Sequence, residues 1–401
     1  MTVCANRRRF LQSAVAFGAT LAVAPAWTED FVNLDLPGGP TQRALTTAFP
    51  QKGSMILQRS RPPLLETPWA VFDRGVFTPN DQFFVRWHWA VIPEQVDVAT
   101  FRLAVRGHVN AALSLSLADL LAMPRVELAA VNQCSGNSRG LFQPRVAGGQ
   151  WQNGAMGNAR WTGVSLRDVL DRAGVKAGAV AVRFNGLDEP VVGGAPDFME
   201  SLDIDHARGG EVMLAYLMNG EQLPLLNGFP LRLIVPGWYS TYWVKMLNDI
   251  EVLDAPDQNY WMATAYRIPD TPFASVKPGE IGFKTVPINR MLPRSFFTNV
   301  PNGTTVKPDA LTPVRGISLA ATAASRRWSS RPMAGAAGEK PNWVATRVHT
   351  AFANGALRLP RQNRARLCST SGAQMPRAKF SRPARTGTVA ALCAPSSSAL
   401  S

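Results

Sequence analysis

The chain has 401 residues, 46% of them hydrophobic, which is enough for one large globular domain or two ordinary ones and leaves the fold class open. Its formal net charge of +14 would favour a nucleic acid or an anionic membrane surface as partner. However, 13 basic residues and one acidic residue follow Arg315, whereas the first 315 residues carry 29 basic and 27 acidic residues. The body of the chain is therefore nearly neutral, and the excess positive charge lies in the tail. A function that depends on a polycation is excluded for the body and is left to the tail.

The first segment is typical of a twin-arginine export signal. Three arginines at positions 7–9 precede a mildly apolar run rich in alanine and glycine, which ends at the small residues Ala24 and Ala26. The run is too short for a membrane-spanning helix, which needs about 20 apolar residues. We expect residues 1–26 to be a signal peptide that directs export of the folded protein to the periplasm. An ordinary amphipathic first helix is the alternative.

Residues 27–79 are rich in proline and glycine and predict an extended N-terminal arm. The following run, 78–93, has strand periodicity, which places Arg86 and His88 on one face. Two cationic or protonatable groups on one face of an aromatic-rich strand would suit a phosphate or another anion. The alternative is an edge strand with a solvated arginine and a histidine that is satisfied within the core.

Two short helices are predicted in the middle of the chain. Ser116 is a suitable N-cap for the first helix and Pro124 its stop. Apolar residues at helical spacing over residues 164–173, followed by Gly174, predict the second helix.

Strands alternate with these helices. Apolar runs at 179–189, 212–220 and 229–237 predict strands, and Asn219-Gly220 predicts a tight turn between two of them. Because strands outnumber helices, we expect an α+β fold with mixed sheets and short helices. Aromatic clusters around Lys245 and Tyr266 favour a core role when they are considered alone.

The cysteines form no CxxC, no CxxCH haem-attachment motif, no zinc spacing and no recognisable disulfide framework; they are Cys4, Cys134, Cys368 and Cys393. Only Cys134 lies in the body of the chain. It is on a turn of small residues, Q-C-S-G-N-S-R, where no bulky side chain blocks its sulfur, and a thiolate is a soft ligand suited to a redox metal. Spacing alone favours the alternative, a small buried hydrophobe.

Five motifs occur in the order found in one family. The body of the chain, from about residue 53 to residue 316, resembles the molybdenum domain of the sulfite oxidase family. Within that family it is most similar to bacterial periplasmic sulfite dehydrogenases, which pass electrons to a c-type cytochrome. The motifs are F-F-V-R-W-H, Q-C-S-G-N-S-R, G-A-M-G-N-A-R-W-T-G, N-G-F-P-L-R-L-I-V-P-G with a trailing W-V-K, and Y-W-M-A-T-A-Y-R-I-P-D.

The resemblance implies a molybdopterin cofactor that carries molybdenum, with Cys134 as the protein ligand of the metal and no haem in this chain. It implies catalytic roles in or beside an anion pocket for Arg86, Arg139, Trp151 and Tyr266. It implies contacts with the pterin and its phosphate for Phe84, Arg86, His88, Asp188, Asn227, Arg232 and Lys245. Asn227 stands where animal members of the family have a histidine.

The resemblance also implies an activity, the oxidation of sulfite to sulfate. Planar guanidinium groups bind small oxyanions bidentately, which agrees with the two arginines of the predicted pocket. Since the sequence has no cytochrome b5-like segment and no CxxCH, we expect the electron acceptor to be a separate protein. The resemblance implies that this acceptor is a c-type cytochrome. The alternatives are a sulfane dehydrogenase subunit of thiosulfate oxidation or a related reductase. A nucleic-acid-binding protein, suggested by the pI of 10.3, conflicts with the export signal and the nearly neutral body.

The family pattern stops at Ile317. In the family, the P-V-R-G-I motif at 313–317 opens an immunoglobulin-like dimer domain, but the residues that follow here are rich in Ala, Arg, Ser and Pro and poor in acid. We expect residues 80–316 to be the catalytic domain and residues 317–401 a disordered basic tail, produced by a frameshift, in place of the dimer domain. The family's homodimer is then not expected. A genuine basic tail that binds an acidic partner is the alternative.

Overall fold

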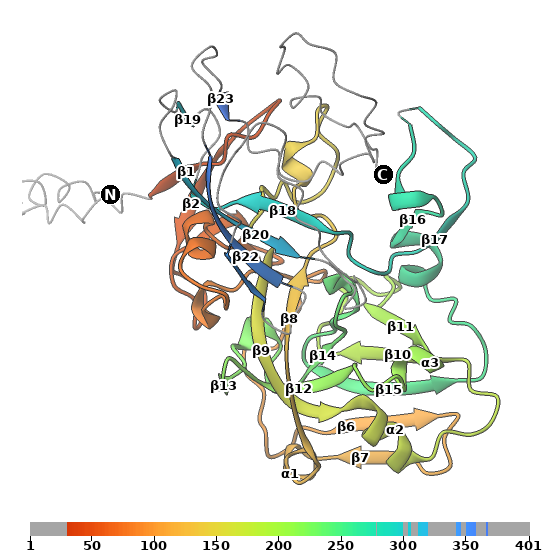
Figure 1. Cartoon of the computed structure of the whole chain (residues 1–401). Coiled ribbons are helices and arrows are strands. Elements are labelled where there is room, and N and C mark those ends of the chain that lie inside the picture. The colour runs from red at the N-terminus through yellow and green to blue at the C-terminus, as the bar shows by residue number, and fades with distance from the viewer. Residues whose placement is uncertain are drawn as a thin grey trace, which may run out of the picture.

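The structure is a computed structural model, and it describes residues 30–277 and 279–299 together with five later strand segments (Figure 1). These segments are 304–305, 312–319, 342–345, 350–357 and 366–367. The predicted signal peptide lies outside the described residues. None of the described helices has the length and hydropathy needed to cross a membrane.

The N-terminal part of the described chain is a sheet, so the prediction of an extended arm over residues 27–79 was wrong. Five antiparallel strands follow in sequence order: β1 (Phe31–Asn33), β2 (Gln42–Thr46), β3 (Met55–Arg59), β4 (Leu64–Glu66) and β5 (Val85–Arg86). Met55 and Leu65 are fully buried and belong to one cluster with Trp87. The strands have two to five residues between prolines and glycines, which is too short for a visible period-2 pattern.

A second sheet leads to the cysteine turn. Its strands lie in the order β13 (Glu221–Gln222), β12 (Met213–Met218), β9 (Met156–Ser165) and β8 (Arg125–Gln133), and β14 (Arg232–Ile234) pairs with β12. The 9 residues of β8 all pair with β9, ending with Gln133 opposite Met156. Cys134 therefore leaves the sheet at the end of β8, and Figure 1 shows this long pair running through the middle of the molecule.

The predicted turn at Asn219-Gly220 is confirmed. It joins β12 to β13, and both residues have positive φ angles, 54° and 83°. A two-residue hairpin turn of this kind needs positive φ at both central positions, which asparagine and glycine tolerate.

A third sheet has the order β11-β10-β15-β6-β7 and contributes to the same core cluster as the second. Its strands are β6 (Leu103–Gly107), β7 (Leu113–Leu115), β10 (Ala181–Gly186), β11 (Met199–Asp203) and β15 (Leu247–Leu253). Only the β15–β6 pair in this sheet is parallel. The combination of mixed sheets and short helices confirms the predicted α+β class.

The helices agree with the sequence prediction except at one boundary. α1 (Leu117–Leu121) begins at Ser116, which forms a capping box with Asp119. α2 (Leu166–Ala173) ends at Gly174, whose φ is 69°. It begins two residues later than predicted because Val164 still pairs within the sheet. α3 (Ile204–Ala207) is a single turn.

Short 3-10 turns and one π turn connect the strands of the described chain. The 3-10 turns are η1 (Trp69–Asp73), η2 (Asn80–Gln82), η3 (Arg139–Leu141), η4 (Leu225–Asn227), η5 (Ser240–Tyr242) and η7 (Pro272–Ala274), and the π turn is η6 (Trp261–Ala265). Several of them carry residues of the predicted site, among them η3 with Arg139 and η4 with Asn227.

The last part of the described chain adds small sheets. β16 (Arg267–Pro269) pairs with β17 (Thr285–Pro287), and β19 (Thr304–Thr305) pairs with β23 (Arg366–Leu367). A four-stranded sheet, which we call the C-terminal sheet, has the order β18 (Arg294–Phe297), β20 (Thr312–Leu319), β22 (Thr350–Leu357) and β21 (Asn342–Ala345).

The prediction of a disordered tail from residue 317 was therefore wrong for these segments. β20 continues to Leu319, because Ile317 and Leu319 alternate inward and are buried in a cluster with Phe72 and Phe296. The other residues after 319, and with them the predicted loss of the dimer domain, lie outside the described part of the chain.

Candidate functional site

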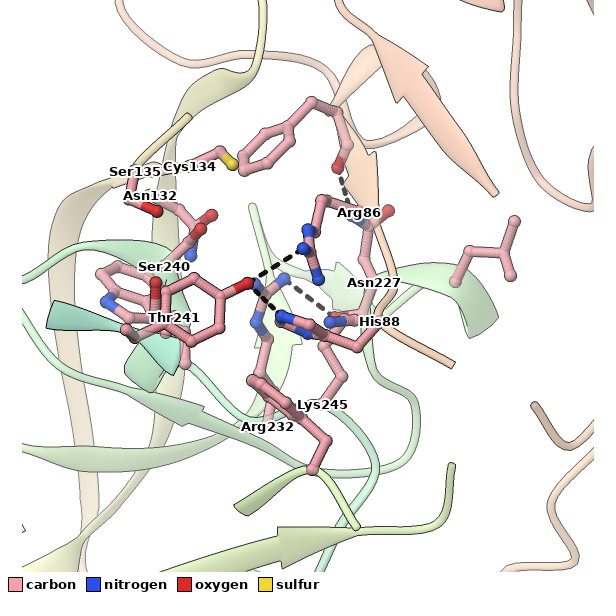
Figure 2. A pocket seen from close by; sticks show the side chains of 15 residues that line it. Arg86, His88, Asn132, Cys134, Ser135, Asn227, Arg232, Ser240, Thr241 and Lys245 are labelled. Atoms are coloured by element: carbon pink, nitrogen blue, oxygen red, sulfur yellow. Dashed lines mark hydrogen bonds between the residues drawn. The ribbon is translucent and has the colours of Figure 1, made fainter. Parts of the chain in front are cut away.

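One pocket collects most of the predicted site residues. Eight of them line it: Phe84, Arg86, His88, Cys134, Asn227, Arg232, Lys245 and Tyr266. The pocket holds about 470 Å³ of empty space, including its open mouth. Figure 2 shows Cys134, Ser135 and Asn132 on one side of it, facing Arg86 and His88, with Arg232 and Lys245 at its far end.

The cysteine turn is held by backbone and amide hydrogen bonds. The Cys134 N–H donates to Ala155 O (2.9 Å), and the Cys134 carbonyl accepts from Asn137 N (3.0 Å). The Asn137 side chain donates to Asn153 O (3.0 Å) and accepts from Ala155 N (3.1 Å). Cys134 is 7% exposed and has a free thiol. The two interpretations of Cys134 are thus compatible, because the thiol is small and buried and also faces the pocket.

Arg86, Tyr266 and His88 form a hydrogen-bonded group across the pocket. Arg86 Nη2 donates to the Tyr266 hydroxyl at 2.9 Å, and the same hydroxyl is hydrogen-bonded to His88 Nε2. The His88 ring is also stacked on Phe198, with ring centroids 3.7 Å apart. These contacts join residues that are 180 positions apart in sequence.

The protonation states of this group follow from its surroundings. Burial, aided by the charge of Arg86, lowers the pKa of His88 well below its usual value, so the ring is neutral at pH 7. Burial raises the pKa of Tyr266 to about 12, so its hydroxyl keeps its proton. Tyr266 therefore accepts from Arg86 and donates to the neutral His88 ring, and the fixed charge of the group is the guanidinium.

Arg232 and Lys245 add two more cations. Arg232 is 4% exposed, its Cζ lies 5.5 Å from the Trp161 ring centroid, and burial lowers its pKa to about 9. Lys245 Nζ lies 4.2 Å from the Trp87 ring centroid. Among the described residues neither cation has a carboxylate within 4 Å. Buried cations without a counter-ion are costly unless an anion joins them, so the pocket is suited to an anionic ligand.

Asp188 lies near these cations but outside the pocket lining. Burial raises its pKa to about 6, and its charge favours the protonated form of Lys245. Burial and the neighbouring Arg232 act in the opposite direction and lower the pKa of Lys245 to about 7. The charge at this end of the pocket therefore changes near neutral pH.

Sulfate, which stays a dianion, is expected to stabilise the cofactor-free protein more at pH 6.5 than at pH 8.5. Below its pKa of about 7, Lys245 is protonated and attracts the anion, and above it the attraction is lost. Arg232, with a pKa of about 9, stays mostly charged at both pH values, while Asp188 gains negative charge as the pH rises and so acts in the same direction as Lys245. We expect sulfate binding to weaken by about tenfold. The shift of Tm with sulfate concentration measures this.

The matched variants for this test are Lys245→Met and Lys277→Met, since Lys277 is exposed and away from the pocket. The loss of sulfate stabilisation between pH 6.5 and pH 8.5 should be much smaller in Lys245→Met than in the wild-type protein, and it should be unchanged in Lys277→Met. Equal stabilisation by sulfate at both pH values in the wild-type protein would contradict the assignment.

The structure assigns a positioning role to Lys52, which the sequence prediction did not select. Its Nζ donates to Asn80 O (2.7 Å), to Phe83 O (3.0 Å) and to Asn227 Oδ1. Asn227 Nδ2 in turn donates to Phe84 O at 3.1 Å. Most of the hydrogen-bonding capacity of Asn227 is therefore used within the protein, which leaves one amide N–H for a ligand. A lysine among prolines and glycines gives no sign of burial, so only its contacts identify it.

Arg139 and Trp151 lie in the loop between Cys134 and β9 and do not line the pocket. A Cβ at Gly136 would lie 3.2 Å from the Arg139 Cζ, and one at Gly148 would lie 1.8 Å from its Nη1. The two glycines thus make room for the guanidinium, and Gly148 also has a φ of 115°. Trp151 is 2% exposed and packs in the main core cluster.

The donors of the pocket fit a metal that brings its own ligands. The described residues contain no group of three His, Cys, Asp or Glu that could hold an ion, so Cys134 is a single soft protein ligand. Four buried polar atoms of the lining have no protein partner: Arg86 Nη1, Arg232 Nε, Asn132 Nδ2 and Asn132 Oδ1. A dithiolene cofactor with a phosphate group would complete the metal ligands, and its anionic groups would accept hydrogen bonds from the three donors among these atoms, Arg86 Nη1, Arg232 Nε and Asn132 Nδ2. Cys134 would hold the metal, and Arg86, Arg232 and Lys245 the anionic parts.

Comparison with known proteins points the same way. Residues 89–261 match the family model of the oxidoreductase molybdopterin binding domain. The chain is 36% identical over 263 residues to the mitochondrial sulfite oxidase of Rattus norvegicus. This match covers 63% of this chain and 47% of that protein. It is 35% identical over 273 residues to the sulfite oxidase of Gallus gallus, and this match covers 66% of this chain and 58% of that protein. The chain thus spans about half the length of the relatives it matches.

The fold has a counterpart among solved structures. The sulfane dehydrogenase SoxCD from Paracoccus pantotrophus matches with a TM-score of 0.59 and 21% sequence identity, covering 75% of this chain and 74% of that one. At this identity the match shows likeness of fold alone. The family model and these relatives support a sulfite oxidase-like oxidoreductase with a molybdopterin binding domain over residues 89–261, and they imply molybdopterin with molybdenum as its cofactor.

Proposed function

We propose that this protein oxidises sulfite to sulfate in the periplasm and passes the electrons to a c-type cytochrome. The observation that carries the proposal is the Nη1 of Arg86, a buried guanidinium donor without a protein partner, on the pocket that also contains Cys134. Sulfite is a small oxyanion, and a guanidinium is the side chain best suited to bind one. Relatives at 35–36% identity are sulfite oxidases, which supports the same substrate class.

In the proposed reaction the cofactor and the residues around the pocket have separate roles. Molybdenum bound to molybdopterin supplies the two-electron redox chemistry and the oxygen-atom transfer. Arg86 binds and orients the anion, while the Tyr266 hydroxyl, which stays protonated, fixes the guanidinium plane and offers a neutral hydrogen-bonding group beside it. The stacking of His88 on Phe198 excludes water from this side. The position of Arg139 behind the cysteine turn adds positive charge that favours entry of the anion.

The overall reaction consumes sulfite and one water and yields sulfate, two protons and two electrons. The electrons leave singly to the acceptor, for which we assign a c-type cytochrome on the resemblance to bacterial sulfite dehydrogenases. The N-terminal arginine motif supports export by the twin-arginine route. A protein exported in this way folds before export and can carry its cofactor with it.

The substrate is tested by steady-state turnover of the exported protein with sulfite and, separately, with thiosulfate. Cytochrome c serves as acceptor in one series and ferricyanide in the other, so that the substrate and the acceptor are tested independently. We expect turnover with sulfite in both series. Turnover with thiosulfate but not with sulfite would replace the proposal by a sulfane dehydrogenase. Turnover with ferricyanide alone would keep the substrate and reject the cytochrome.

A further inference from the structure

We propose that Arg294 is a positioning residue for the metal-ligating turn and that it couples the C-terminal sheet to Cys134. Arg294 is the first residue of β18, at the edge of that sheet. It lies outside the five motifs that identify the family, and the proposal does not depend on which sulfur compound is oxidised.

Arg294 reaches three points around Cys134. Its Nη1 donates to Gln133 Oε1 at 3.4 Å, and its Nη2 donates to Ser138 Oγ and to Asn153 Oδ1, the latter at 3.1 Å. Gln133 precedes the cysteine directly, Ser138 follows it at the end of the turn, and Asn153 lies where the loop returns to β9. One guanidinium therefore connects both arms of the loop that presents the thiol.

The turn needs such a connection at Ser138. This residue has a φ of 73°, in the left-handed region that a non-glycine residue adopts at a cost. Its hydroxyl accepts from Arg294 and donates to Asn153 Oδ1 at 2.5 Å. The arginine thus stabilises a strained backbone conformation that directs the chain from Cys134 to Arg139.

The guanidinium also brings an uncompensated charge to the turn. Among the described residues no carboxylate lies within 4 Å of it, and the groups that face it are neutral: Gln133, Ser138, Asn153 and Tyr239. Its Nε is buried without a partner. Burial lowers its pKa to about 10, which leaves it charged at neutral pH. A fixed positive charge beside the metal ligand favours the reduced, more negative form of the centre.

A second contact attaches the same sheet to the body and supplies the matched control. Arg315, in β20, forms a bidentate ion pair with Asp73 at the surface, away from the cysteine turn. Replacing Arg315 weakens the attachment of the sheet without touching the loop around Cys134. Replacing Arg294 affects both.

The test compares Arg294→Gln, Arg294→Lys and Arg315→Gln in the full chain loaded with cofactor. Two quantities are measured: molybdenum per chain, and the midpoint potential of the molybdenum from a redox titration followed by electron paramagnetic resonance. We expect Arg294→Gln to retain about tenfold less molybdenum, the size of effect seen when outer contacts of metal ligands are removed. Its loaded fraction should have a lower midpoint potential. Arg294→Lys, which keeps the charge, should keep the potential and lose part of the metal.

Arg315→Gln should match the wild-type protein in both measurements. An Arg294→Gln variant with wild-type molybdenum content and potential would overturn the proposal, as would an equal loss in Arg315→Gln. If Arg294→Gln does not accumulate as folded protein, Arg294→Lys decides. Wild-type metal content and an unchanged resonance spectrum in that variant would show that the hydrogen bonds to the turn are dispensable.

Discussion

Replacing Cys134 by serine is expected to remove molybdenum from the protein and to lower sulfite oxidation by more than about 100-fold. Loss of an outer-shell contact already costs about 10- to 100-fold in metal affinity or activity, and Cys134 is the single soft protein donor on the pocket. A serine hydroxyl does not ionise at neutral pH and is a hard oxygen ligand, so it cannot replace a thiolate. Metal analysis and turnover with ferricyanide measure the two effects.

The fold should survive this change. Serine and cysteine have similar volume, and the hydrogen bonds of the turn come from backbone groups and from Asn137 and Asn153, which the substitution leaves in place. We expect the Tm of the cofactor-free Cys134→Ser variant to lie within a few degrees of wild type, which corresponds to a change of about 1 kcal/mol in the free energy of unfolding. Retention of molybdenum in this variant would refute the assignment of Cys134 as the metal ligand.

Replacing Arg86 by glutamine is expected to lower kcat/KM for sulfite by about 10²- to 10³-fold. Truncation of one partner in a buried, hydrogen-bonded charge pair costs about 2–5 kcal/mol, and 1.36 kcal/mol corresponds to a factor of ten. Glutamine can still donate to Tyr266, so the change removes mainly the charge and the free Nη1 donor. Because Arg86 binds the ground-state anion as well, KM should rise together with a fall in kcat.

Arg102→Gln is the matched control, since this arginine is exposed, donates to the neighbouring backbone oxygens of Ala99 and Phe101 and does not line the pocket. Its kinetic constants should equal those of the wild-type protein. A wild-type kcat/KM for sulfite in Arg86→Gln, with the cofactor fully loaded, would contradict the role given to Arg86.

Local features of the fold could be predicted from the sequence where a short stretch carries its own signal. The capped helix after Ser116, the helix that ends at Gly174 and the Asn219-Gly220 turn each depend on neighbouring residues, and the structure contains all three. The N-terminal sheet was missed because each of its strands has at most 5 residues. Such strands acquire their conformation from pairing partners, which a local pattern does not show.

The site could be predicted only from the order of its motifs. Periodicity places Arg86 and His88 on one face but says nothing of Tyr266, which reaches them from 180 positions away. Spacing alone would have made Cys134 a core residue. The resemblance to one family supplied the connection, and the structure brings eight of the selected residues to one pocket. Arg139, Trp151 and Asp188 lie close to it without lining it.

Lys52 and Arg294 show what neither periodicity nor motifs reveal. Most lysine and arginine side chains lie at the surface. The roles of these two depend on partners that are distant in sequence: Asn227, 175 positions from Lys52, and Ser138, 156 positions from Arg294. Both hold the protein groups that surround the pocket, and Lys52 does so through Asn227. Residues of this kind are identified by the partners they hold, and those partners are known only once the chain is folded.

The central claim is that the pocket around Cys134 holds molybdenum in molybdopterin. The most direct test is the metal and pterin content of the wild-type protein, purified after export from cells that make the cofactor. We predict about one molybdenum and one molybdopterin per chain, both absent from the Cys134→Ser variant. Folded, exported wild-type protein without molybdenum or pterin would contradict the claim.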